Sequence, residues 1–445
     1  MTQPAFFLDA SACSGCKACQ AACKDKNDLP VGVLWRRVYE VTGGGWTRAG
    51  ASWTSDVFAY HLSLACHHCA RPICVEVCPT QAMHQRGDGI VVVDHDRCMG
   101  CQYCSWACPY DAPQYDRARG HMTKCDFCAD NLAAGKPPAC VAACPMRALE
   151  TRERQDSSPD VTPLPVASLT QPALMVKPHH AALRLGVLGN AEEVSAPRGS
   201  ENSLIAFTLL AQLAVGATWF RSVSERYDGR ALALITVIML IALLASFVHL
   251  GQPRHAWRAI TNLRTSWLSR EVLSAALFLV SLIGVLATGG SGIWLANATG
   301  LALIVSMARV YALRTVPEWN HRATTASFFV TTLLLGAVVH GALIGAGPEW
   351  ASGAMGLIGV RLLIGRREPR TVQLLRAAVI VALLMTLFAP TGWWVALALV
   401  SIAEVVARRQ FYAKREPRSA WRFALHDPRH DRSVASGAPV SSPTG

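Results

Sequence analysis

The sequence predicts two parts of different class, namely an α+β domain at the N-terminus and an all-α bundle of about eight membrane-spanning helices after it. Three observations on the 445-residue chain support this prediction. All 16 cysteines lie in the first 144 residues. Long apolar stretches occur only between about positions 203 and 407. Between these regions, residues 151–202 contain Ser-Pro and Thr-Pro sequences and no apolar run long enough to cross a bilayer.

The cysteines form four groups of four, with spacings typical of iron–sulfur ligation. The first and third groups follow C-x2-C-x2-C-x3-C. The second and third cysteines are separated by four residues in the second group and by eleven in the fourth, and the other spacings are unchanged. Bacterial ferredoxins use such a run to supply three thiolates to one [4Fe-4S] cluster and one thiolate to another. Four ligands per cluster therefore predict four clusters. The groups are Cys13, Cys16, Cys19 and Cys23; Cys66, Cys69, Cys74 and Cys78; Cys98, Cys101, Cys104 and Cys108; and Cys125, Cys128, Cys140 and Cys144.

Two other uses of the cysteines are less consistent with the sequence. A disulfide framework requires an oxidising compartment, and the first residues do not read as a signal peptide. Structural zinc uses paired C-x2-C units, whereas here a third cysteine follows closely in the first three groups, and a proline follows the fourth cysteine in three groups. Iron–sulfur ligation is therefore the preferred interpretation.

The predicted domains follow from these patterns. Residues 1–150 alternate short cysteine loops with strand-like runs such as Gly89–Asp94, which predicts a ferredoxin-like iron–sulfur domain of two pseudo-repeated units with two clusters each. Residues 151–202 are expected to form a flexible linker. Residues 203–410 form the predicted transmembrane domain, and residues 411–445 a largely disordered cytoplasmic tail.

Eight apolar stretches approach the length of about 20 residues that a membrane-spanning helix requires. The sixth stretch is short and rich in glycine, so seven spans are the alternative to eight. The expected spans are residues 203–221, 231–250, 272–290, 293–313, 323–345, 350–365, 372–389 and 391–407.

The arginines predict the orientation of these spans. They are abundant after spans two, four, six and eight, and the loops after spans three, five and seven contain no Lys or Arg. The loop after span one, with Arg221, Arg226 and Arg230, is the exception. The C-terminus and, with eight spans, the iron–sulfur domain are therefore expected on the cytoplasmic side of a bacterial inner membrane. Because no nucleic-acid motif accompanies the net charge of +12, no nucleic-acid partner is predicted.

The N-terminal half resembles the four-cluster electron-transfer subunit of dimethyl sulfoxide reductase-type molybdenum enzymes. The resemblance rests on CKACQAACKD at 16–25, CPYDAPQY at 108–115, KCDFC at 124–128 and CPMRAL at 144–149. The second half resembles the membrane anchor subunit of the same enzymes, through SFVHLG at 246–251, SRE at 269–271 and PEWN at 317–320. The two halves are separate chains in most relatives, so this chain resembles a fusion of them.

The resemblance implies how the cysteines are shared among the clusters. Groups one and four would hold two clusters, and groups two and three the other two. The implied sets are Cys13, Cys16, Cys19 and Cys144; Cys125, Cys128, Cys140 and Cys23; Cys66, Cys69, Cys74 and Cys108; and Cys98, Cys101, Cys104 and Cys78. Some relatives have tryptophan at the position of Cys101 and a three-iron cluster, so the cysteine here implies four irons.

The resemblance also implies the partners and the function. A separate subunit with a molybdopterin cofactor would transform the substrate, and this chain would carry electrons between that subunit and the membrane quinone pool without catalysing the main reaction itself. The predicted cytoplasmic orientation favours the relatives that oxidise sulfite. Quinol-dependent reduction of dimethyl sulfoxide or N-oxides by a periplasmic complex is the alternative, and a stand-alone membrane redox sensor is an alternative of another class.

Two residues are candidates for exchanging protons with a quinone. His249 lies at the end of the second predicted span, and related anchors use a histidine of this motif at the quinol site. Its alternative role is anchoring at the membrane interface. Glu271 begins the third predicted span and would otherwise favour the helix start as a carboxylate.

Other polar and aromatic residues in the spans have simpler expected roles. His340 and Glu404 line an internal polar path or join helices by hydrogen bonds, two interpretations that the sequence does not separate. Arg361 is expected to extend toward the interface. Trp393 and Trp394 are expected in an aromatic belt at the bilayer surface.

Overall fold

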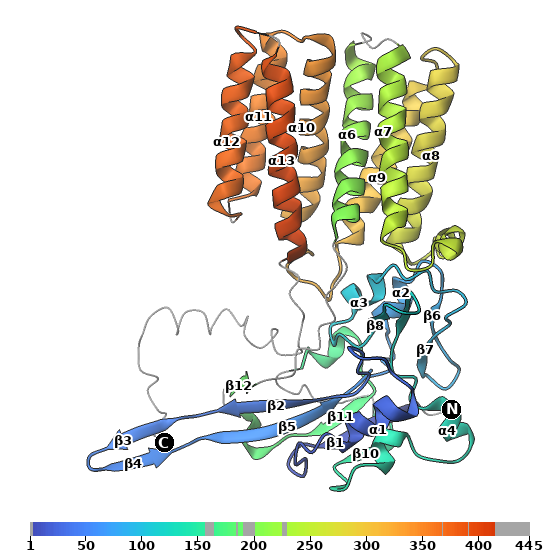
Figure 1. Ribbon diagram of the computed structural model, residues 1–445, viewed down its shortest axis with the longest axis vertical. Coiled ribbons are helices and arrows are strands. Elements are labelled where there is room, and N and C mark those ends of the chain that lie inside the picture. The colour runs from blue at the N-terminus through green and yellow to red at the C-terminus, as the bar shows by residue number, and fades with distance from the viewer. Residues whose placement is uncertain are drawn as a thin grey trace. The chain divides into compact units, whose positions relative to one another are not determined.

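The computed structural model describes residues 3–155, 164–183, 186–189, 201–224, 229–366, 368–389 and 391–413. The chain divides into two compact units (Figure 1). The first unit holds the described residues up to Glu76 and those from Ala82 to position 189. The second holds the segment Val77–Gln81 and the described residues from position 201 onward. Strands and short helices make up the first unit and long helices the second, which confirms the predicted order of an α+β part followed by an all-α part.

Two three-stranded sheets form the body of the first unit. In one, β1 lies between β10, to which it is antiparallel, and β11, to which it is parallel. In the other, β2 pairs with β5 and β12, antiparallel to both. The core between these elements contains Phe6, Leu8, Tyr60 and Leu62 together with many of the cysteines. The strands are β1 (Pro4–Asp9), β2 (Arg37–Gly43), β5 (Phe58–Leu64), β10 (Leu149–Glu153), β11 (Leu174–Lys177) and β12 (Gly186–Gly189).

The described residues of the first unit also form three hairpins, five short α-helices and two 3-10 helices, η1 (Ala167–Leu169) and η2 (His180–Leu183). The hairpins are β3 (Trp46–Ala49) with β4 (Ser52–Ser55), β6 (Met83–Gln85) with β7 (Val91–Val93), and β8 (Gln114–Asp116) with β9 (His121–Thr123). The strand predicted at Gly89–Asp94 corresponds to β7. Each cysteine group contributes to a helix. The helices are α1 (Ala18–Lys26), α2 (Ile73–Glu76), α3 (Tyr103–Ala107), α4 (Ala129–Ala133) and α5 (Ala139–Ala142).

The region expected to be a flexible linker has regular structure in its described part. Residues of β11 continue the sheet of β1, with Phe6 opposite Leu174 and Leu8 opposite Val176. The Thr170 hydroxyl also shares a hydrogen bond of 2.9 Å with the hydroxyl of Tyr110. The described prolines of this region, Pro165, Pro172 and Pro178, lie outside its helices and strands, and the expectation of a flexible linker is therefore wrong for residues 164–183. Positions 156–163 and 190–200, and the predicted tail from position 414, lie outside the described residues.

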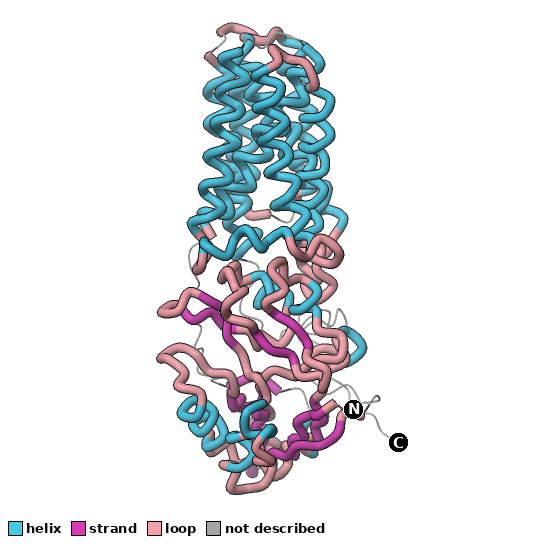
Figure 2. The backbone as a smooth tube through the Cα atoms, turned by 90° about the vertical axis from the view of Figure 1, so that its right-hand side faces the viewer, coloured by secondary structure: helices cyan, strands magenta, loops and turns pink. Residues whose placement is uncertain are grey.

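Eight long helices form the body of the second unit within the described ranges, and they run side by side (Figures 1 and 2). A 3-10 helix, η3 (Pro253–Ile260), precedes the third of them. The helices are α6 (Asn202–Ser224), α7 (Gly229–Val248), α8 (Trp267–Ala287), α9 (Ile293–Val310), α10 (Arg322–Ile344), α11 (Pro348–Ile364), α12 (Arg370–Met385) and α13 (Gly392–Ala413).

Length and hydropathy separate these helices into two classes. Five of them, α6 to α10, are long and apolar enough to cross a membrane. Helices α11 and α12 have 17 and 16 residues, which is at or just below the lower end of the usual range, and α13 ends in a charged segment that includes Arg408 and Arg409. The chain is therefore an integral membrane protein with at least these five candidate spans among its described residues.

Helix α6 is central to the packing of the second unit, since it contacts α7, α9, α10 and α13. Its approach to α10 depends on two glycines that face each other. A Cβ atom on Gly216 would lie 2.1 Å from the carbonyl oxygen of Thr332 and 2.9 Å from the Cα atom of Gly336. The two backbones touch at this point, and close approach of small residues is a principal source of helix association in a membrane.

Candidate iron–sulfur and quinone sites

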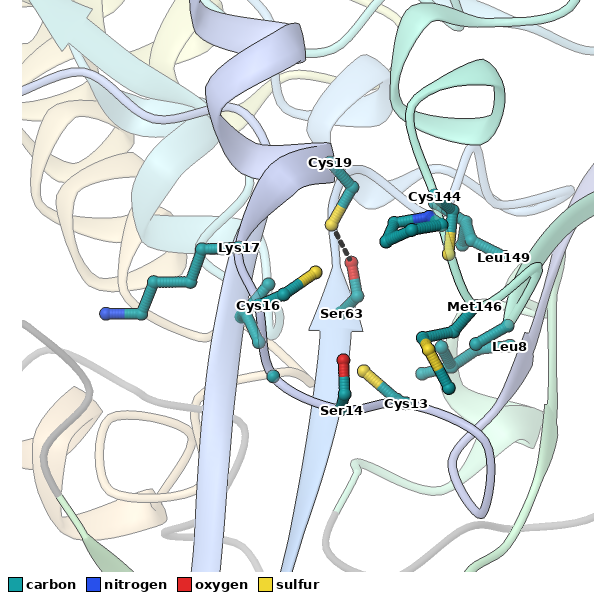
Figure 3. A pocket seen from close by; sticks show the side chains of 14 residues that line it. Leu8, Cys13, Ser14, Cys16, Lys17, Cys19, Ser63, Cys144, Met146 and Leu149 are labelled. Carbon is teal, nitrogen blue, oxygen red and sulfur yellow. Dashed lines mark hydrogen bonds between the residues drawn. The ribbon is translucent and has the colours of Figure 1, made fainter.

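One cavity of the first unit is surrounded by four cysteine side chains (Figure 3). Cys13 and Cys16 come from the loop after β1, Cys19 from the first turn of α1, and Cys144 from the loop after α5. Figure 3 shows the Sγ atoms of these cysteines directed toward the same space, and the Cys19 sulfur contacts the hydroxyl of Ser63 at 3.2 Å. These four cysteines are the first of the ligand sets implied by the resemblance.

Each cysteine group turns the chain sharply just before its second cysteine. The residue at that position has a positive φ in all four groups, namely Gly15 (71°), His68 (40°), Gly100 (72°) and Phe127 (64°). This conformation is uncommon for residues other than glycine, and it directs successive backbone N–H groups to one side of the turn. Such concave turns suit the sulfur atoms of an iron–sulfur cluster.

Glycine is required at the first of these positions for a second reason. A Cβ atom on Gly15 would lie 2.4 Å from the ring of His61. The turn therefore needs both a positive φ and the absence of a side chain, which only glycine provides.

Two further groups of cysteines lie close enough together to interact electrostatically. Cys23 interacts with Cys128 and Cys140, and Cys125 interacts with Cys23 and Cys140. These four belong to the second implied set. In the third implied set, Cys74 interacts with Cys66, Cys69 and Cys108. In the fourth, the Cys98 sulfur accepts a hydrogen bond of 3.4 Å from the backbone N–H of Met122, and its grouping with Cys78 stays a prediction.

The cysteine donor set fits iron–sulfur clusters. All sixteen cysteines are free thiols, and most are buried. Burial raises the pKa of Cys23 and of Cys108 to about 12, so a free thiol there binds its proton tightly and a positively charged metal core has to displace it. Backbone N–H groups already point at sulfur, as at Phe127, whose N–H lies 3.4 Å from the Cys125 sulfur. Hydrogen bonds of this kind help to set cluster potentials.

The core beside these cysteines contains charged and titratable side chains that the sequence analysis did not single out. Lys124 is buried, and its ammonium group donates to the carbonyl oxygens of Val91 and Cys125. His67 and His68 are fully enclosed, and burial lowers the pKa of His67 to about 3 and keeps that of His68 well below its usual value. Both imidazoles are therefore neutral at ordinary pH. Their only sequence signal is their place between Cys66 and Cys69.

The two quinone candidates lie at the same end of neighbouring helices. His249 directly follows α7, and Glu271 is in the second turn of α8. The Nδ1 atom of His249 is buried without a hydrogen-bond partner among the described residues. Glu271 is only 4% exposed and interacts electrostatically with Tyr311 and Tyr412, whose hydroxyl groups are hydrogen-bonded to each other.

The structure corrects one alternative for Glu271. Helix α8 begins at Trp267, five residues before the start of the predicted span, and its N-cap is Ser266, whose side chain accepts from the N–H of Ser269. Serine is a preferred N-cap residue, which explains the earlier start. Glu271 is thus enclosed within the helix and is not a residue that begins it.

The second unit includes the short segment that carries Cys78, and side chains near the start of α8 bind the backbone of this segment. Asn262 donates to the carbonyl oxygen of Cys78 at 2.9 Å, and Ser266 donates to that of Val77 at 2.8 Å. These two bonds hold the backbone of Val77 and Cys78 near the start of α8, the helix that carries Glu271.

Helices α11, α12 and α13 are joined by buried ion pairs. Arg376 pairs with Glu404 at 2.8 Å and with Glu368 at 2.6 Å, and Arg361 pairs with the same carboxylates at 3.2 Å and 3.0 Å. The charges of the two arginines and two glutamates cancel. Glu404 therefore joins helices, and the expectation that Arg361 extends toward the interface is wrong because its charge is satisfied inside the bundle.

The expected aromatic belt is also corrected at one position. Trp393 is 1% exposed, and its indole N–H donates to the carbonyl oxygen of Ala346 at 3.1 Å. Trp394 is 55% exposed, which agrees with a lipid-facing or interfacial position. Adjacent helix positions face different directions, so only one of the two tryptophans reaches the surface.

Comparison with protein families assigns both parts of the sequence. Residues 57–154 match the family described as a 4Fe-4S dicluster domain. Residues 199–388 match the family of the DMSO reductase anchor subunit (DmsC). The two matches are consecutive, in the order expected for a fusion.

Curated relatives resemble the N-terminal half. One component of the anaerobic dimethyl sulfoxide reductase of Escherichia coli (strain K12) is 49% identical over 203 residues, which cover 43% of this chain and 99% of the relative. One component of the sulfite dehydrogenase of Allochromatium vinosum is 38% identical over 170 residues, 33% of this chain and 68% of the relative. The formate dehydrogenase iron-sulfur subunit of Wolinella succinogenes is 37% identical over 166 residues, 32% of this chain and 78% of the relative.

Proposed function

Because the protein belongs to the family of dimethyl sulfoxide reductase iron–sulfur subunits and carries that enzyme's anchor domain in the same polypeptide, we propose that it relays electrons between a catalytic subunit and the membrane quinone pool. The observation that carries this proposal is the presence of both domains in one polypeptide. An iron–sulfur domain provides redox centres, and an anchor domain provides access to lipid-soluble quinones.

The redox centres of the proposal are four [4Fe-4S] clusters, held by the four cysteine sets given above. Support comes from the cavity that Cys13, Cys16, Cys19 and Cys144 surround and from the proximity of the cysteines in two further sets. The clusters supply one-electron transfer when bound. The contribution of the chain is to hold the thiolates, to direct N–H groups at sulfur and to exclude water from the buried sites.

The proposal places quinone exchange near His249 and Glu271, with all eight helices crossing the bilayer. A quinone that is reduced takes up protons, and a quinol that is oxidised releases them, so a buried carboxyl group and an imidazole at the same end of neighbouring helices are suited to this step. The ion pairs among α11, α12 and α13 support the crossing of these shorter helices, because they neutralise the charges that a bilayer excludes.

The proposed partner is a separate catalytic subunit with a molybdopterin cofactor, as in the dimethyl sulfoxide reductase-type enzymes that this chain resembles. Two substrates are candidates. The arginine-rich loops favour an iron–sulfur domain on the cytoplasmic side of a bacterial inner membrane, and this favours sulfite oxidation. The greater identity to the dimethyl sulfoxide reductase component than to the sulfite dehydrogenase component favours sulfoxide reduction on the periplasmic side.

The relay is tested with the purified full-length protein in detergent. Its clusters are reduced chemically, an oxidised menaquinone analogue is added, and the visible absorbance of the clusters is followed. We expect the quinone to reoxidise the clusters at a rate that saturates with quinone concentration. Reoxidation that stays absent, although iron analysis gives a full complement of clusters, would contradict the proposal.

The side of the membrane is tested with C-terminal reporters. Fluorescence of a green fluorescent protein fusion without activity of an alkaline phosphatase fusion would support the cytoplasmic orientation and sulfite oxidation. Phosphatase activity would contradict both and favour sulfoxide reduction.

A further inference from the structure

A fully buried arginine lies among cysteines of two different implied cluster sets. Arg36, which directly precedes β2, is 1% exposed. It interacts electrostatically with Cys19 of the first set and with Cys23, Cys125 and Cys140 of the second. Within the described part of the chain no carboxylate pairs with its guanidinium group, although a buried cation normally requires a negative partner.

Hydrogen bonds connect Arg36 to both sets. The Nη1 atom of Arg36 donates to the Ser63 hydroxyl at 3.2 Å, and the same hydroxyl contacts the Cys19 sulfur at 3.2 Å (Figure 3 shows the second contact). The backbone N–H of Arg36 donates to the thiol of Cys23. One residue thus reaches the first set through Ser63 and the second set directly.

The guanidinium group also has hydrogen-bonding capacity left over. Its Nε and Nη2 atoms are buried and have no partner among the described residues. The ring of Phe6 packs against its face, 4.4 Å from Cζ, and fixes its plane. A buried N–H group without an acceptor costs free energy, so the site is complete only when an anionic acceptor such as a thiolate or an inorganic sulfide of a cluster is present.

We propose that Arg36 is the shared counter-charge of two neighbouring clusters, those of Cys13, Cys16, Cys19 and Cys144 and of Cys23, Cys125, Cys128 and Cys140, and that it raises the reduction potential of both. The inference deepens the proposed relay and rests on it. A cluster held by four thiolates is anionic and gains a further negative charge on reduction, so a fixed cation in a low dielectric favours the reduced state. Arg36 acts as a positioning residue and not as a ligand.

The test is an electron paramagnetic resonance titration of the full-length protein, with iron and acid-labile sulfide measured on the same samples. In Arg36→Gln we expect two of the four midpoint potentials to fall by at least about 59 mV each. For a one-electron couple this shift changes the oxidised-to-reduced ratio of the cluster tenfold at a fixed ambient potential. The other two should stay close to the wild-type values. Arg36→Lys keeps the charge and should restore most of the lost potential. Ser63→Ala should affect the cluster of Cys19 more than that of Cys23.

The matched control is Arg152→Gln, which removes one positive charge from the same unit at a position whose side chain is 48% exposed. It should leave all four potentials nearly unchanged, because water screens an exposed charge. The proposal is overturned if Arg36→Gln retains its iron with four unchanged potentials, or shifts all four equally. If Arg36→Gln loses iron, the result for Arg36→Lys replaces it as the test. Retention of the clusters in Arg36→Lys would support the proposal, and loss of the same clusters would overturn it. A wild-type protein without four clusters would instead contradict the proposed function.

Discussion

Arg376 donates to Glu404 at 2.8 Å inside the helical unit, and both side chains are almost completely enclosed. Removing one partner of a buried pair leaves the other charge without compensation, at a cost of about 3–5 kcal/mol. Arg361 still pairs with Glu404, so we expect Arg376→Met to lower the free energy of unfolding by about 3 kcal/mol, near the lower limit of that range. Denaturant titration of the wild type and the variant in detergent micelles measures this difference in the free energy of unfolding. The control is Arg370→Met, an exposed arginine on the same helix, whose stability should match that of the wild type.

Because Gly216 contacts the backbone of α10 and Gly284 faces open space, we expect alanine to destabilise the protein at the first position and not at the second. In Gly216→Ala the added methyl group would meet the Thr332 carbonyl oxygen, and we expect a loss of about 1–3 kcal/mol from overpacking. In Gly284→Ala nothing lies within 4 Å of the new Cβ atom, so the higher helix propensity of alanine should leave stability unchanged or raise it by about 1 kcal/mol. The melting temperature in detergent compares the two variants. Equal values would contradict the close packing of α6 on α10.

Cys144 provides a test of the cavity in Figure 3 as a cluster site. We expect Cys144→Ala to lose one of the four proposed clusters or to convert it to a three-iron form, with total iron falling by up to about a quarter. Iron analysis and electron paramagnetic resonance of the purified protein measure the change. Ser14→Ala alters the lining of the same cavity without removing a thiol, and its iron content should remain at the wild-type level. The same iron content in both variants would exclude Cys144 as a ligand.

Glu271 is expected to be needed for quinol chemistry and not for electron transfer within the first unit. Glu271→Gln keeps the side-chain size and removes the ability to accept a proton. We expect quinone-linked reoxidation of the clusters to slow by about 10²–10⁴-fold. Reoxidation by a soluble dye that bypasses the quinone site should stay normal. Glu349→Gln, at an exposed carboxylate of α11, is the control. Slowing of both the quinone and the dye reactions would point to a general loss of structure.

His249→Gln extends the same test to the second candidate. Its buried Nδ1 atom lacks a partner among the described residues, so we expect weaker quinone binding, seen as a rise in the half-saturating quinone concentration. His255→Gln, in η3 of the same connecting segment, is the comparison. An unchanged concentration in His249→Gln would exclude a direct contact with the quinone.

Local patterns made much of the architecture predictable. The cysteine spacing indicated iron–sulfur ligation because three thiolates of one cluster must come from a short loop. The apolar stretches located α6 to α13 with boundaries that differ by at most six residues, and the largest deviations fall at α8 and α13. The start of α8 was misplaced because polar residues of its first turn, including Ser269 and Arg270, interrupt the apolar pattern although Ser266 caps the helix.

Other features required information from distant parts of the chain. The proline-containing region expected to be a linker contains β11, whose strand character depends on β1, more than 160 residues earlier. Arg36 and Ser63 meet because β2 and β5 pair in antiparallel register, with Val38 opposite Ser63. Nothing local to either residue indicates that they are neighbours, since sheet register is set by the whole packed face.

The sequence by itself determined the redox class, the membrane character and the order of the two parts, because thiolate spacing and hydropathy are properties of short segments. Only the tertiary structure decided which charges are satisfied inside the protein and which remain available. It paired Arg361 and Arg376 with Glu368 and Glu404, while leaving Arg36 among thiols and Glu271 enclosed near two tyrosines. The physical reason is that the energy of a buried charge depends on every neighbour within a few ångströms, and these neighbours come from remote positions in the chain.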